Sequence, residues 1–130
     1  MEYNSNLTTF DYITKKQLLD GQQLSILIFI YSILMVYEGI LQQKEVAKAE
    51  YNNEKIEGIN PQETINTALN ILFFAQFLTT LIGFRQYNYL YNKSINGEYE
   101  NSLDPNRYTN IGNLLWLIGI YFLIKGAEEI

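Results

Sequence analysis

The sequence predicts an all-α integral membrane protein with three transmembrane helices, the first two of which extend beyond the bilayer. Three apolar stretches support this prediction, at residues 24–41, 67–84 and 111–124. A helix needs about 20 apolar residues to cross the hydrocarbon core, and the first two stretches approach that length. Leu24–Tyr37 also lacks the regular polar stripe expected of a helix in a small soluble bundle. A soluble helical interaction protein is the alternative fold.

The chain of 130 residues is short enough to form one domain, which we take to be residues 1–130. The expected parts, in chain order, are a polar N-terminal arm at 1–20, span one at 22–42, a polar helical loop at 43–60, span two at 67–86, a polar loop at 92–104 and span three at 108–127.

The polar arm is expected to lead into the first span through one continuous helix. Thr14 is a candidate N-cap for a helix that begins at Lys15 and continues through Gly21. The arm itself is either an amphipathic segment on the membrane or on a partner, or a disordered tail. Beyond the span, a mixed run of Lys and Glu is typical of a solvated helical face, and Gly58 is a candidate end for this helix.

The clearest start signal in the chain precedes the second span. Asn60 is a good N-cap, Pro61 suits the first helical position, and Glu63 stands where a capping box needs an acidic residue. Amphipathic tyrosine rings and a cation follow the span, which is typical of a belt at the membrane interface. This helix is expected to end near residue 91, and the belt consists of Arg85, Tyr87, Tyr89 and Tyr91.

The third helix is framed by turn and cap residues. Asn96-Gly97 predicts a turn in the loop before it, and Asp104-Pro105 repeats the arrangement of a capping residue followed by proline. Lys125 in the last turn and Gly126 after it are expected to end the helix.

Two stripes of small residues predict close helix packing, either within the chain or with a partner. Their members recur every four residues in the second span and every seven in the third. The stripes are Ala75, Thr79 and Gly83, and Gly112, Gly119 and Gly126.

Polar residues within the apolar stretches are candidates for an intramembrane polar or ion site. Glu38 is the one acidic residue in such a stretch, and it is either an interfacial residue or a proton or ion site. Asn70, Gln76 and Asn113 are uncharged polar residues at membrane depth, which either hydrogen-bond across helices or line a pore or a quinone head-group site.

Composition excludes more chemistry than any motif supports. The chain has no Cys and no His, so a disulfide, a thiolate or imidazole metal ligand and the commonest catalytic bases are all excluded. Its formal net charge of −5 argues against nucleic-acid binding. We therefore expect no enzymatic activity, no catalytic residue, no metal and no cofactor, and a bound lipid is the one ligand left open.

These observations favour a non-catalytic accessory or structural subunit of a larger multi-subunit membrane complex, with other membrane subunits and the lipid bilayer as partners. Size and composition favour an energy-converting assembly, either respiratory-chain or ATP synthase, in the mitochondrial inner membrane, with a bacterial inner membrane as the alternative location. The alternative function is a small homo-oligomeric channel, holin or transporter with a polar path near Glu38, Gln76 and Asn113.

Overall fold

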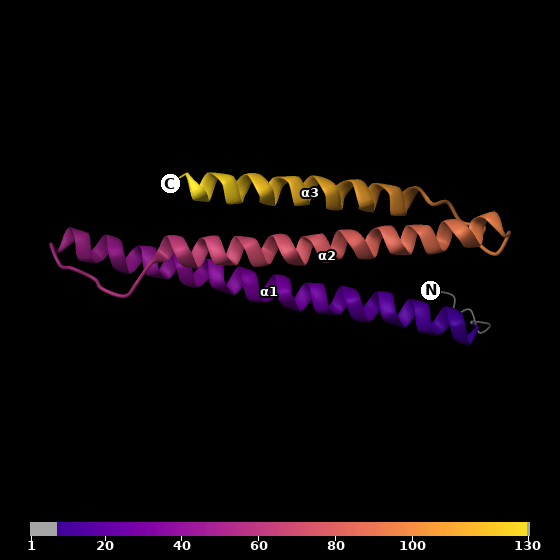
Figure 1. The fold of residues 1–130 in the computed structure, drawn as a ribbon, viewed down its shortest axis with the longest axis horizontal. Coiled ribbons are helices and arrows are strands. Elements are labelled where there is room, and N and C mark those ends of the chain that lie inside the picture. Colours follow the sequence, from indigo (N-terminus) through magenta and orange to yellow (C-terminus); the bar gives the residue numbers. More distant parts are fainter. Residues whose placement is uncertain (1–7, 130) are drawn as a thin grey trace.

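The protein is a bundle of three long helices. The computed structural model describes residues 8–129, so the expectation for residues 1–7 of the polar arm lies outside the described part. The helices are α1 (Thr9–Tyr51), α2 (Pro61–Ile95) and α3 (Asp104–Glu128). They run side by side as nearly parallel rods, with α2 packed against both α1 and α3 (Figure 1). The chain reverses at each loop, so the start of α1 and the end of α3 lie at opposite ends of the bundle.

All three helices are long and apolar enough to cross a membrane, as predicted. At 1.5 Å per residue, the 43 residues of α1 span about 65 Å and the 35 residues of α2 about 52 Å. Both lengths exceed the roughly 30 Å thickness of a hydrocarbon core.

Helix α1 begins earlier than the sequence indicated. Thr8 is the N-cap, and its hydroxyl oxygen accepts a hydrogen bond of 3.1 Å from the backbone N–H of Asp11. The same hydroxyl donates to the Asp11 carboxylate at 2.8 Å. The expected start at Lys15 with Thr14 as cap is therefore wrong, because this earlier capping pair starts the helix six residues before Lys15.

Helix α1 also ends earlier than expected, at Tyr51 and not near Gly58. Asn53 has a φ of 56°, a left-handed conformation that asparagine tolerates better than most residues. The N–H of Asn53 bonds to the carbonyl of Glu50 at 3.2 Å, and the N–H of Glu54 bonds to that of Ala49 at 2.8 Å. This is the Schellman pattern, which satisfies the last carbonyls of the helix.

Helix α2 begins as predicted. The Asn60 side chain accepts a hydrogen bond of 3.2 Å from the backbone N–H of Glu63, and Pro61 occupies the first turn. The helix continues to Ile95, about one turn beyond its expected end. It stops where Gly97 takes a φ of 73°, within the predicted Asn-Gly turn.

Helix α3 begins at Asp104, but Asp104 does not act as the cap. Leu103 is in the N-cap position without a side-chain cap, and the carboxylate of Asp104 pairs with Arg107 at 3.0 Å within the first turn. The helix continues through Gly126 to Glu128, so the expected end at Gly126 is wrong. Gly126 is an ordinary helical residue, because positive φ among the described glycines occurs at Gly58 and Gly97.

The apolar core of the bundle is small and lies on α2. Leu69 and Leu72 of α2 pack with Ile120 of α3, and Phe29 of α1 reaches the same cluster. The Phe29 ring also meets Trp116 edge to face, with centroids 5.5 Å apart, which gives α1 and α3 a direct contact. Most other large apolar side chains point outward, as expected for helices solvated by lipid.

Candidate functional site

Close approach of α1 to α2 depends on small residues of α1. Ser25, Ser32 and Gly39 are buried and lie seven residues apart, the heptad spacing of a helix–helix seam. A Cβ added to Gly39 would lie 2.5 Å from Cγ1 of Ile65, and one added to Gly21 would lie 3.0 Å from Cδ1 of Ile82. Sequence reasoning missed this seam, although the same search for small residues at heptad spacing would have found it.

The small-residue stripe of α2 is used inside the chain. Ala75 is buried, and the hydroxyl of Thr79 donates to that of Ser25 on α1 at 3.1 Å. A Cβ added to Gly83 would lie 2.5 Å from Oδ1 of Asn110 on α3. The stripe therefore lets α2 pack closely against both neighbouring helices.

The glycine stripe of α3 makes no close contact with the other described helices. A Cβ added to Gly112, Gly119 or Gly126 would meet no atom of residues 8–129 within 4 Å. The α3 residues turned toward α2, among them the buried Asn110 and Ile120, lie largely on the opposite side of the helix.

Large apolar residues alternate with these glycines along the same exposed face. Leu115 follows Gly112 by three residues and is 64% exposed, and Phe122 follows Gly119 by three residues and is 67% exposed. Steps of three and four residues keep all five residues in one row along the helix. This row, Gly112, Leu115, Gly119, Phe122 and Gly126, is called the glycine row below.

Two of the predicted intramembrane polar residues lie together, and the third is elsewhere. The buried Gln76 amide donates to the backbone carbonyl of Asn113 at 3.1 Å and lies 3.4 Å from its side-chain oxygen. Glu38 is exposed, one residue before the Gly39 contact with α2. Gln76 and Asn113 therefore bridge α2 and α3, while Glu38 is turned away from them.

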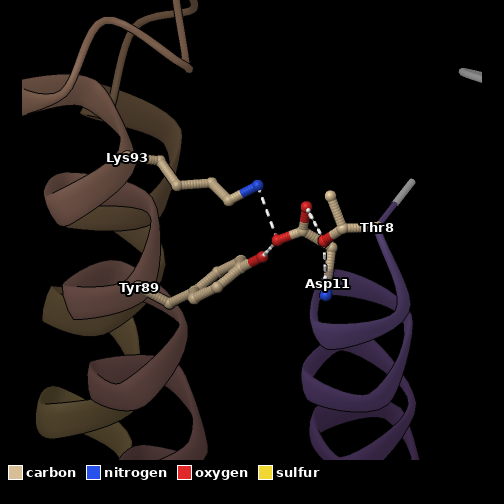
Figure 2. A network of polar contacts seen from close by, with 4 residues as sticks. All are labelled: Thr8, Asp11, Tyr89 and Lys93. Atoms are coloured by element: carbon tan, nitrogen blue, oxygen red, sulfur yellow. Dashed lines mark hydrogen bonds and ion pairs between the residues drawn. The ribbon is translucent and has the colours of Figure 1, made fainter. Parts of the chain in front are cut away.

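A polar cluster joins the start of α1 to the end of α2. The hydroxyl of Tyr89 donates to the Asp11 carboxylate, and Nζ of Lys93 pairs with the same carboxylate at 2.6 Å (Figure 2). Lys93 and Tyr89, together with Thr8, hold the pKa of Asp11 well below its usual range. The ion pair raises the pKa of Lys93 in turn.

The predicted tyrosine belt forms contacts between helices at this same end. Tyr89 bonds to α1 as described, and the hydroxyl of Tyr87 accepts a hydrogen bond of 3.3 Å from Arg107 on α3. Tyr87 also stacks on Tyr91 with ring centroids 6.1 Å apart. These tyrosines combine the amphipathic character of an interfacial belt with a role in joining all three helices.

These clusters provide packing and hydrogen bonding between the helices. Among residues 8–129, no group of three acidic, cysteine or histidine side chains is placed to hold a metal ion. Every buried side-chain nitrogen and oxygen in that range has a hydrogen-bond partner. The helices therefore present several packing faces. One of them, the glycine row, contacts no other helix among residues 8–129.

No protein-family model matches the chain, and comparison with curated proteins and with solved structures gave no match.

Proposed function

We propose that this protein is a non-catalytic structural subunit of a multi-subunit membrane complex, and that the glycine row of α3 is the face that meets another subunit. The observation that carries the proposal is the open space beside Gly112, Gly119 and Gly126. Glycines let two helix backbones approach closely in lipid, where van der Waals packing and hydrogen bonds drive association.

The use of small residues elsewhere in the chain supports this proposal. In α1, Gly21 and Gly39 lie against isoleucine side chains of α2, so close packing occupies the space beside them. The glycine row has the heptad spacing of the Ser25, Ser32 and Gly39 seam, but no residue among 8–129 fills the space beside its glycines. Leu115 and Phe122 alternate with its glycines, which gives a partner helix both hollows and protruding side chains to interlock with.

The setting of the complex is a separate part of the proposal. Size and composition favour an energy-converting assembly of the mitochondrial inner membrane, and the absence of Cys and His fits a subunit that leaves redox and metal chemistry to others. The helices of spanning length support a membrane location of some kind.

The test is native purification of the tagged protein in mild detergent, followed by mass spectrometry of the co-purifying proteins. The wild-type chain is expected to bring a fixed set of different subunits. Gly119→Leu fills one hollow of the glycine row and is expected to remove that set while leaving the helical circular dichroism of the chain unchanged.

Ile118→Phe is the matched control, because it adds bulk to an exposed residue of the same helix outside the glycine row. Its subunit set is expected to equal that of the wild-type chain. Purification of the wild-type chain alone as a homo-oligomer would contradict the proposal. An unchanged set with Gly119→Leu would show that another face makes the contact.

A further inference from the structure

A pocket between α1 and α2 is lined mainly by polar residues. Its volume is about 320 Å³, and five of its six lining residues carry polar or charged groups. The lining residues are Thr14, Gln17 and Leu18 from α1, and Arg85, Asn88 and Tyr89 from α2.

The pocket lies where a membrane would present its head groups. Arg85 directly follows Phe84, the last residue of the apolar stretch of α2, and Asn88 lies three residues further on. At 1.5 Å per residue these positions are within roughly 6 Å of the end of the apolar stretch. The head-group layer on each face is of about that depth, since it adds roughly 10–15 Å in total to the hydrocarbon core.

Arg85 supplies the positive charge of this pocket. Among residues 8–129 it forms no ion pair with an acidic side chain. The acidic residues nearest in the α1 sequence are already engaged, because Asp11 pairs with Lys93 and Asp20 with Lys16. The guanidinium of Arg85 is therefore not engaged by a carboxylate among residues 8–129.

The other polar groups of the pocket supply donors suited to an anion. The amides of Gln17 and Asn88 and the hydroxyl of Thr14 each have an N–H or O–H to donate. The guanidinium of Arg85 matches the oxygens of a phosphate in two parallel hydrogen bonds. Along the two helices, the pocket lies between the Asp11–Tyr89 contact and the close approach of Gly21 to Ile82.

We propose that this pocket binds the phosphate group of an anionic membrane phospholipid, with Arg85 as the charged anchor and the side chains of Gln17, Asn88 and Thr14 as further donors. The inference rests on the membrane insertion that the proposed function also assumes. It does not depend on the glycine row, which lies on another helix.

The experiment is native mass spectrometry of the full chain in detergent during titration with phosphatidylglycerol. The wild-type protein is expected to retain one lipid, and Arg85→Gln is expected to weaken retention by about tenfold or more, as the loss of a charge-assisted hydrogen bond predicts. Arg85→Lys keeps the charge but loses the paired geometry, so its affinity is expected to lie between the two.

Lys15→Gln is the matched control, because Lys15 is an exposed cation at the same end of the bundle that does not line the pocket. Its affinity for the lipid is expected to stay within about twofold of wild type, because Lys15 lies outside the pocket lining. Equal losses in Arg85→Gln and Lys15→Gln would overturn the pocket, since the effect would then be general surface charge.

Two further experiments test where the phosphate group comes from and whether the protein is inserted in a membrane. Competition by millimolar inorganic phosphate would identify a soluble anion as the occupant and overturn the lipid assignment, whereas lipid retention in its presence supports it. Extraction of the protein from membranes by alkaline carbonate would overturn membrane insertion, and with it the proposed function. Resistance to carbonate without selective lipid retention would overturn the pocket alone.

Discussion

The glycines of α1 and those of α3 have opposite surroundings in the same small bundle. Beside Gly39, an added Cβ would lie 2.5 Å from Cγ1 of Ile65, whereas beside Gly119 it would meet nothing within 4 Å. Both belong to rows with heptad spacing. The comparison teaches that the spacing of small residues indicates a packing face, while only the structure tells whether the chain itself already fills that face.

The largest expected loss of stability comes from Gly39→Leu. The new side chain would overlap Ile65 and force α1 away from α2, and overpacking of this kind costs about 1–3 kcal/mol. We expect a lower midpoint of unfolding in detergent, followed by circular dichroism. Gly112→Leu is the matched control on α3, and a loss of stability as large as that of Gly39→Leu would contradict the contrast between the two rows.

An intermediate effect is expected for the polar bridge between α2 and α3. Gln76→Leu removes the amide that bonds to Asn113, and a hydrogen bond between membrane helices contributes about 0.6–2 kcal/mol. The same unfolding measurement would detect this loss. Asn70→Leu is the control, because the exposed Asn70 amide donates to Asn66 within its own helix and joins no neighbour. Equal destabilisation by both changes would show that the bridge contributes nothing specific.

The smallest expected effect concerns the ion pair at the exposed end of the α1–α2 hairpin. The folded pKa of Asp11 lies below its ordinary value of 3.8, so its contribution is present above that value and is lost as the pH falls toward the folded pKa. The pKa of Lys93 is raised above its ordinary 10.5, so its contribution is present below that value and is lost as the pH rises through the folded pKa. The start of α1 and the end of α2 should therefore stay in contact between about pH 4 and pH 10.

Spin labels on cysteines introduced at Lys15 and Asn92 would measure this docking as a distance distribution, because the chain has no cysteine of its own. The distribution is expected to stay narrow across that window and to broaden below it. Asp11→Asn should broaden it throughout. Asp20→Asn is the control, since Asp20 pairs with Lys16 on the same helix, and a broad distribution there too would remove any special role for Asp11.

A local sequence pattern predicts a helix end correctly where residues within one turn determine it. Asn60 and Pro61 fix the start of α2 because their cap and backbone preferences act within one turn. Both ends of α1 were misplaced because two local candidates competed. Thr8 prevailed over Thr14, and Asn53 in a left-handed conformation prevailed over Gly58.

The contacts between helices required the structure. The sequence indicates that Gln76 and Asn113 are polar residues within the membrane, but not that they bond to each other. It placed Glu38 beside them in one hypothetical path, whereas α1 turns Glu38 outward. Which face of a helix meets which neighbour depends on residues far apart in the chain, so no local pattern determines it.

At one end of the bundle, α1 and α2 extend well beyond their apolar stretches. Fifteen residues of α1 precede Leu24 and eleven residues of α2 follow Phe84, which correspond to columns of roughly 22 Å and 16 Å at 1.5 Å per residue. Asp11, Tyr89 and Lys93 fasten these two columns together near their tips. In a bilayer, these two helix ends would form a rigid projection of fixed height. A partner bound at its tip would be held at a set distance from the lipid surface.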